Sequence, residues 1–460
     1  MPSSATRSDS GDSRVDGIFS PTYFATTIGL LMAITACAFD NTAVTAVMPR
    51  ITEELGNTDA YSLAFSIPFA VSIVAMVAAG ITTDIAGARL SMLTGTGILT
   101  AGLGLAVIAP DMTVFLISRG IQGFGIGAVI VAIYAIIAQM YPAALRPRIF
   151  AAFAGAWVIP SLIGPAFAGI LTESLSWHSV FLFTLFLLII AAILMLPAIR
   201  TLPARRGSLS RTGIRMLGAA LLLSAATGIL NYSPHLALGT GLVSFIIAAP
   251  LIAVSIQPLV PAGTLRGRIG VPRLIASRIL TDMVLGAEIY VPLLLAQAYG
   301  LGPTLTGLGL TASGVTWFMG SQIQAHFADD WSMPAVARFS GAAMATGLLI
   351  VAVTAGVGAP WLLAVAGWGL SAFGIGFIYP RLSSEPFELS TPEQSGFIGS
   401  ALQVAGITGM TLSIAIGALT LALLNSVDVH TRFLTTFLVL AGSVTPFMLL
   451  WRPARVTRVH

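Results

Sequence analysis

The sequence has 460 residues, of which 56% are hydrophobic and only 9% are charged, and its mean hydropathy is +0.93. A soluble domain carries about 25% charged residues, so this composition excludes an ordinary soluble protein and indicates a chain that lies mostly in lipid. The net charge of +4 is no nucleic-acid signal, because the basic residues are 22 arginines in short clusters between apolar runs, without a lysine. A single cysteine, Cys37, excludes an intrachain disulfide.

Residues 1–18 are rich in Ser, Asp and Arg and lack the apolar stretch of a signal peptide, so we predict a disordered cytosolic tail. The rest of the chain divides into apolar segments long enough to cross a hydrocarbon core of about 30 Å. Fourteen spans are predicted, although the seventh and eighth could instead form one re-entrant hairpin. The predicted spans are 22–48, 60–83, 88–109, 112–140, 148–172, 178–199, 212–232, 236–257, 274–299, 303–327, 335–357, 360–380, 394–424 and 431–451.

The arginines orient these spans. With the N-terminus inside, the outer loops hold only Arg50 and Arg432, Arg119 lies within a span, and the other nineteen of the 22 arginines lie in inner segments. Such a bias toward the inner side is expected for a correct count and orientation. We therefore expect both termini to be cytosolic and the protein to lie in the cytoplasmic membrane.

The two longest inner connections flank the seventh and eighth spans and divide the chain. We predict an all-α integral membrane protein with two six-helix bundles separated by a two-span insert. The predicted units are the tail 1–18, an N-terminal bundle over 19–200, the insert with its linkers over 201–272, a C-terminal bundle over 273–452 and a cytosolic tail over 453–460.

Two opposite charges fall within the first and fourth spans. A charge in mid-membrane costs about 2.5–3.5 kcal/mol on insertion scales, and such residues usually face a cavity or a partner. Asp40 lies about 13 Å and Arg119 about 10 Å from the predicted outer end of its span, so an ion pair is possible if both face one cavity. Either Asp40 takes a proton and releases Arg119, or the pair is a static salt bridge.

The ninth span carries further candidates for proton coupling. Asp282 follows Arg278 by four residues near the inner end, so an ordinary helix pair is the simpler interpretation of these two. Glu288 lies near mid-membrane without a basic residue within two turns. Burial without a partner favours a neutral carboxyl group, which suits an acid that gains and loses protons or binds substrate. The alternative is a permanently protonated, hydrogen-bonded acid near Tyr290.

Two segments suit conformational change rather than binding. In "GITTDIAGAR" (80–89), Gly80 and Gly87 permit a tight turn, Asp84 can cap a neighbouring helix and Arg89 can bind lipid headgroups or an acid. In the fifth span, prolines remove helix hydrogen bonds and glycines allow close helix approach; the alternative is a merely kinked structural helix. The residues concerned are Pro160, Gly164, Pro165 and Gly169.

These motifs resemble those of the fourteen-span drug:proton antiporters of the major facilitator superfamily. "FDNTAVTAVMPRITEELG" is similar to the signature of their first span, with Thr45 in place of the usual Asn. The 80–89 segment resembles the superfamily's loop motif without its basic residues at 85 and 88. The fourth-span motif of the family is similar to "RGIQGFGIG", and the fifth-span motif is similar to "PSLIGPAFAG", with Pro160 and Ala168 in place of glycines. The start of the family's sixth span resembles "WHSVF", and the turn after its ninth span resembles "AQAYGLGPTLTGLGL".

The resemblance implies two six-helix bundles around a central cavity, with two extra spans between them in the chain, and alternating access. It implies export of a small molecule driven by inward proton flow, a monomer in the lipid bilayer, and neither a cofactor nor a metal. Protonation of Asp40 or Glu288 would shift which face is open. Cavity residues suited to apolar, aromatic or cationic compounds are then Tyr134, Trp157, Tyr290 and Trp317.

Two other functions stay open. Thr45 and the incomplete loop motif allow a related carrier for a defined metabolite, lipid or siderophore. A polytopic membrane enzyme or receptor is the third possibility, but an enzyme would need converging His, Asp or Cys residues, and the five histidines are scattered over both sides.

Overall fold

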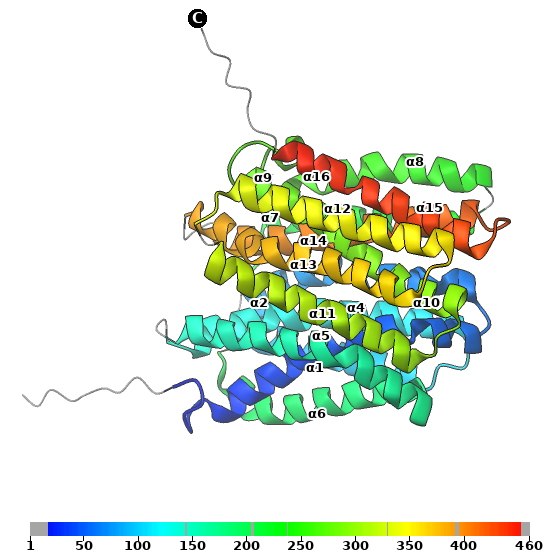
Figure 1. Ribbon diagram of the computed structural model, residues 1–460. Coiled ribbons are helices and arrows are strands. Elements are labelled where there is room, and N and C mark those ends of the chain that lie inside the picture. The colour runs from blue at the N-terminus through cyan, green and yellow to red at the C-terminus, as the bar shows by residue number, and fades with distance from the viewer. Residues whose placement is uncertain are drawn as a thin grey trace, which may run out of the picture.

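The computed structural model describes residues 17–142, 145–203, 207–236, 238–328, 330–391 and 395–451. Within these ranges the chain is helical, without strands, and its long helices run side by side (Figure 1). The predicted disordered tails 1–18 and 453–460 fall outside them except for residues 17 and 18. Ile18 is buried, and its carbonyl accepts a hydrogen bond from Thr27 Oγ1 at 2.6 Å, so the predicted tail extends too far by at least this residue.

The first half of the chain forms six long helices, in the lower part of Figure 1. Each begins within a few residues of a predicted span. α1 packs against α5 and α6, and α4 packs against α2 and α3. They are α1 (Phe24–Glu54), α2 (Leu63–Ala86), α3 (Ala88–Val107), α4 (Met112–Met140), α5 (Arg146–Ser174) and α6 (His178–Thr201).

The second half forms another group of helices, in the upper part of Figure 1. Two of its spans are interrupted: a 3-10 turn, η5 (Ala287–Ile289), divides the ninth predicted span, and Ser443 divides the last. The helices are α9 (Val271–Gly286), α10 (Tyr290–Tyr299), α11 (Pro303–Phe327), α12 (Met333–Val357), α13 (Trp361–Glu388), α14 (Ser395–Leu423), α15 (Val429–Gly442) and α16 (Val444–Leu450).

The insert consists of α7 (Arg211–Tyr232) and α8 (Leu238–Ser255). It is central in the sequence but lies to one side in space, where α7 packs against both α2 and α14 and α8 packs mainly on α7 (Figure 1). Asn231 Nδ2 of α7 donates to the carbonyl of Thr411 in α14 at 3.3 Å. One apolar cluster joins the insert to both halves of the chain, through Ile73 of α2 and Ile407 of α14.

Thirteen helical segments among the described residues are long and apolar enough to cross a membrane. The tenth predicted span, 303–327, which forms α11, is not among them, although it has 25 residues. Its sequence explains the difference, because Thr, Ser, Gly and Gln interrupt its apolar residues. α11 packs against α5 and α13 and exposes Leu305, Leu308 and Phe318. It therefore has an apolar face that can meet lipid, and the predicted architecture of fourteen membrane helices holds.

Candidate functional site

Asp40 of α1 and Arg119 of α4 form the ion pair that the sequence made possible. Arg119 Nη1 lies 2.8 Å from Asp40 Oδ2, and the two side chains are 2% and 1% exposed. The pair is therefore sealed inside the N-terminal bundle and does not face an open cavity in this conformation. Asp40 Oδ1 has no hydrogen-bond partner among the described residues, so one strong acceptor is left unsatisfied beside the arginine.

Arg119 is also held by a backbone carbonyl that a proline leaves free. Pro68 lies inside α2 and has no N–H to donate to the carbonyl of Ala64, four residues earlier. Arg119 Nε donates to that carbonyl at 3.1 Å. Nη1 also donates to Gln122 Oε1 at 2.5 Å, and the Gln122 amide donates to the Gly102 carbonyl of α3 at 3.2 Å. The guanidinium thus joins four helices of the bundle.

A second buried ion pair lies in the C-terminal half. Arg278 Nε donates to Asp282 Oδ2 at 2.5 Å, as the spacing of four residues predicts. Contacts to α13 were not predicted: Arg278 donates to the Tyr379 hydroxyl and, at 3.4 Å, to Ser383 Oγ, and its guanidinium lies 4.0 Å from the Tyr379 ring centroid. Tyr379 and Ser383 lie one helical turn apart on one face of α13, but the sequence does not reveal that this face meets Arg278.

Glu288 is the third carboxylate within the predicted spans. It is partly exposed and lies in the η5 turn between α9 and α10. Pro292 explains why the helix is interrupted here, since it cannot donate to the carbonyl of Glu288. Within the described residues the Glu288 side chain has neither an ion pair nor a hydrogen bond. The alternative of an acid hydrogen-bonded near Tyr290 is not observed, because the Tyr290 hydroxyl donates to the Ile414 carbonyl.

The four aromatic residues predicted to line a cavity differ in their surroundings. Tyr290 is 1% exposed and packs against α14 at Gly417, so it is a core residue and that prediction is wrong. Tyr134 is 39% exposed, and its ring lies 5.3 Å from the Phe153 ring at an interplanar angle of 41°. Trp157 and Trp317 are partly buried, and Trp317 meets the Tyr379 ring at 4.9 Å.

The proline and glycine motif of α5 contacts both halves of the chain. Pro160 frees the carbonyl of Ala156, and Thr35 of α1 donates to it at 3.4 Å. Gly164 packs against Thr42 of α1. On the other side, a Cβ on Gly169 would lie 2.6 Å from the Pro303 carbonyl oxygen at the start of α11, so only glycine allows this approach.

The α5–α11 contact continues along the helices. A Cβ on Gly307 of α11 would lie 2.7 Å from the carbonyl carbon of Pro165. A Cβ on Gly314 would lie 2.6 Å from the carbonyl oxygen of Ser161, which has no helical hydrogen-bond donor because Pro165 lacks an N–H. At the end of α5, Glu173 accepts hydrogen bonds from the Thr304 N–H at 3.0 Å and hydroxyl at 2.6 Å. The two halves are therefore closed against each other at the predicted outer side.

The 80–89 segment forms a sharper turn than expected. α2 continues through Gly80 to Ala86, and nothing lies within 4 Å of a Cβ on Gly80, so the prediction of a turn or close contact at Gly80 is wrong. Only Gly87 leaves the helix, with φ +92°, a conformation that glycine adopts readily. Asp84 and Arg89 are exposed and make no side-chain hydrogen bond or ion pair to other described residues.

No group of three or more His, Cys, Asp and Glu side chains within the described ranges is arranged to hold a metal ion. The site instead consists of two buried Arg–Asp pairs, one in each half of the chain, and an unpaired carboxyl group at a helix break. Such ionisable groups inside a helical membrane bundle are characteristic of a transporter.

Sequence and structure comparisons agree with that class. The model of the Major Facilitator Superfamily matches residues 30–406, so the chain belongs to this superfamily. Multidrug resistance protein 3 of Bacillus subtilis is 25% identical over 402 residues, which cover 85% of this chain and 78% of that protein. A probable multidrug-efflux transporter of Mycobacterium tuberculosis is 24% identical over 422 residues, which cover 86% and 89% of the two chains.

Solved structures show the same fold. A POT family transporter in complex with a thioalcohol-conjugated peptide superposes with a TM-score of 0.69 over 92% of this chain and 95% of that chain, at 11% sequence identity. The predicted major-facilitator fold, with two six-helix bundles and two additional membrane helices, is confirmed. The chain is thus a multi-pass membrane transporter of this superfamily.

Proposed function

We propose that this protein exports drug-like or amphipathic small molecules in exchange for protons by alternating access, and that Glu288 gains and loses the coupled proton. The observation that carries the proposal is the charge balance within the membrane. Among the described carboxylates inside the predicted spans, Asp40 and Asp282 each have an arginine partner, whereas Glu288 has none. A lone carboxylate in a low-dielectric interior is neutralised either by a proton or by a cationic ligand.

This competition would couple export to proton entry. A cationic or amphipathic substrate that binds beside ionised Glu288 would be released when a proton replaces it, because the site stabilises only one positive charge at a time. The proton gradient would be the energy source, without a cofactor. Multidrug efflux relatives at 24–25% identity support this substrate class.

Asp40 and Arg119 would contribute to coupling as a sealed pair. Protonation of Asp40 would weaken its bond to Arg119 and shift the balance between conformations. Both termini would be cytosolic, as the arginine distribution predicts, and the protein would be a monomer in the cytoplasmic membrane.

Everted membrane vesicles with an imposed pH gradient test the proposal. We expect wild-type vesicles to move a cationic dye such as ethidium and to lose this transport when a protonophore collapses the gradient. Glu288→Gln imitates the protonated acid, so this variant should bind the cationic dye weakly and lose gradient-driven transport. Glu53→Gln is the control, since that carboxylate is exposed and lies outside the predicted spans. Gradient-driven transport that persists in Glu288→Gln would contradict the assignment.

A carrier for one defined metabolite is the second candidate. The polar cluster of Arg278, Tyr379 and Ser383 favours it, because fixed hydrogen-bond donors select for polar groups on a ligand. A compound panel in a pump-deficient host separates the two candidates: resistance to several unrelated compounds supports multidrug export, and resistance to none supports the selective carrier.

A further inference from the structure

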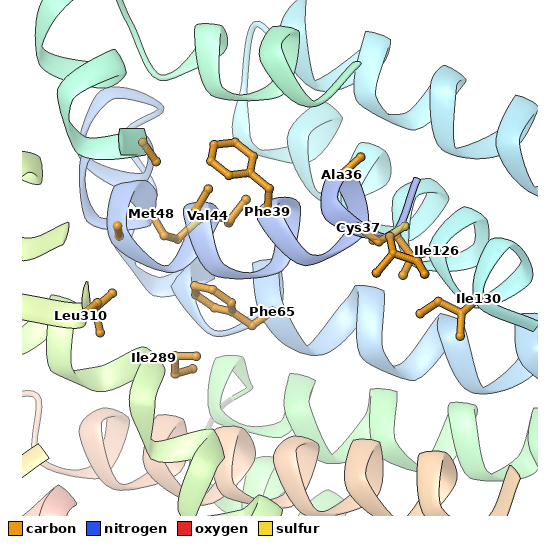
Figure 2. Packing of buried hydrophobic residues seen from close by; sticks show 14 of the residues in the cluster. Ala36, Cys37, Phe39, Val44, Met48, Phe65, Ile126, Ile130, Ile289 and Leu310 are labelled. Atoms are coloured by element: carbon orange, nitrogen blue, oxygen red, sulfur yellow. The ribbon is translucent and has the colours of Figure 1, made fainter. Parts of the chain in front are cut away.

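Tyr61 links the N-terminal half to the break that carries Glu288. It ends the short 3-10 helix η1 (Thr58–Tyr61), which lies between α1 and α2. Its side chain is 3% exposed, and its hydroxyl donates to the carbonyl of Ile289 at 2.5 Å. The Tyr61 ring packs against Phe65 at 5.3 Å, and Figure 2 shows Phe65 and Ile289 within one packed apolar cluster.

Ile289 is the last residue of η5, so this hydrogen bond acts on the turn next to Glu288. Two other features fix the same turn. Pro292 denies the Glu288 carbonyl its helical donor, and Gly286 lies against α14, where a Cβ would be 2.9 Å from the Met410 carbonyl oxygen. Pro292 and α14 belong to the same half of the chain as Glu288. Tyr61 is the constraint that comes from the other half.

We propose that Tyr61 is a positioning residue that ties the orientation of Glu288 to the closure of the predicted outer side. The hydrogen bond can exist only while the two halves are in contact, as they are at Glu173 and Thr304. When the halves separate, the Ile289 carbonyl loses this donor. A 3-10 turn has poorer hydrogen-bond geometry than an α-helix and often marks a hinge, so η5 relaxes and the Glu288 side chain is reoriented.

This inference rests on the proposed function in taking Glu288 as the proton-coupling group. The titratable groups on the surrounding elements do not take over the proposed role of Glu288 as the proton-coupling group. In the described residues α14 carries no charged side chain, and the nearest buried acids, Asp40 and Asp282, are paired with arginines. The other titratable or charged groups on the elements packed against η5 and α10 are Cys37, Arg50, Glu53 and Glu54 of α1, Tyr61 of η1, Arg273 and Arg278 of α9, Tyr290 and Tyr299 of α10, His326 of α11, Tyr379, Arg381, Glu385 and Glu388 of α13, and His430 and Arg432 of α15.

The variant Tyr61→Phe removes the hydroxyl and keeps the ring. Tyr299→Phe is a matched control, because the Tyr299 hydroxyl also donates to backbone carbonyls, those of Thr354 and Ala359, but within one half of the chain. Cys37 is buried and is the only cysteine. A Cys37→Ala background therefore allows a single reporter, Ala166→Cys, which faces Gly307 at the α5–α11 contact.

The full-length protein in sealed vesicles is labelled from the predicted outer side with a membrane-impermeant maleimide, and dye transport is measured against pH. In Tyr61→Phe we expect labelling to rise about two- to tenfold, the effect of losing one hydrogen bond. We also expect the pH of half-maximal transport to shift by up to about one unit. Tyr299→Phe should change neither quantity.

Equal behaviour of Tyr61→Phe and Tyr299→Phe in both measurements would overturn the inference. A rise in labelling without a pH shift would also overturn it, because Tyr61 would then act on the gate without acting on Glu288. The proposed function fails by a different result, namely gradient-driven transport that persists in Glu288→Gln with an intact Tyr61.

Discussion

Arg119 of α4 and the carbonyl of Ala64 in α2 are joined by a hydrogen bond of 3.1 Å, made possible by a proline one turn further along α2. Arg119 therefore has a fixed position that depends on Asp40 only in part. If Asp40 is protonated, the guanidinium keeps the Ala64 carbonyl and Gln122 as partners. Release of the ion pair would then change the charge at Asp40 more than the position of Arg119.

The first prediction concerns the stability of this pair. Asp40→Asn leaves a buried guanidinium without its counter-charge, and breaking a buried pair in this way costs about 3–5 kcal/mol. We expect a strongly lowered unfolding temperature of the purified protein in detergent. The double variant Asp40→Asn/Arg119→Met should recover much of the loss, because neither charge remains. If the double variant is no more stable than Asp40→Asn, charge imbalance is not the cause.

The second prediction tests the close contact of α4 with α2. A Cβ on Gly123 would lie 2.7 Å from the carbonyl carbon of Pro68, and overpacking typically costs about 1–3 kcal/mol. Gly123→Ala should therefore lower the unfolding temperature. Gly104→Ala in α3 is the control, since nothing lies within 4 Å of a Cβ there and alanine favours a helix. A similar loss in both variants would contradict the contact.

The third prediction concerns closure of the predicted outer side. Glu173→Ala removes both hydrogen bonds to Thr304 and with them the negative charge at the start of α11, where a carboxylate is favoured. We expect the open state to become several-fold more populated, as read from maleimide labelling of the Ala166→Cys reporter. Glu173→Gln should have a smaller effect because an amide oxygen can still accept. Unchanged labelling in Glu173→Ala would argue against this contact as a gate.

The fourth prediction concerns pH. Asp428 precedes α15, and hydrogen bonds from Thr431 hold the pKa of its carboxyl below the ordinary value of 3.8. A carboxyl group whose pKa is lowered by folding stabilises the folded protein at pH values above its ordinary pKa. This contribution is lost as the pH falls through the lowered pKa. Asp428→Ala should therefore be less stable than wild type at pH 7. The difference should shrink below about pH 4, measured as unfolding temperature against pH; a difference that does not depend on pH would contradict this assignment.

Much of the architecture could be predicted because lipid imposes a simple rule on sequence. Each span must be a helix of about 20 mostly apolar residues, so span positions follow from hydropathy. The Asp40–Arg119 pair could be anticipated for a related reason: two isolated charges at similar depth in neighbouring spans have few partners other than each other. The arginine distribution fixes the orientation of all spans at once. It also constrains the number of spans, because one span too many or too few would move the arginines that follow it to the outer side.

Helix faces could not be predicted in the same way. α13 supplies Tyr379 and Ser383 to the Arg278 cluster, and the Tyr290 side chain packs into the core. Both outcomes depend on how each helix is rotated about its own axis. These helices carry apolar residues on all sides, so hydropathy does not distinguish an inward face from one that meets lipid. The helix break at Glu288 was equally hidden, although Pro292 marks it in retrospect.

The lateral position of α7 has a consequence for any rocking motion of the two halves. α7 contacts α2 through apolar side chains and α14 through Asn231, and the residues just before it join the 80–89 segment, where the Gly207 N–H donates to the Ile85 carbonyl at 2.8 Å. If α2 and α14 move apart, α7 can follow only one of them, and its surface toward the other must slide or become exposed to lipid. In such a motion the contact between α7 and the helix it leaves would resist the separation of the two halves. Shortening the α7 side chains at that contact would then be expected to change the speed of the transport cycle without altering the ionisable groups.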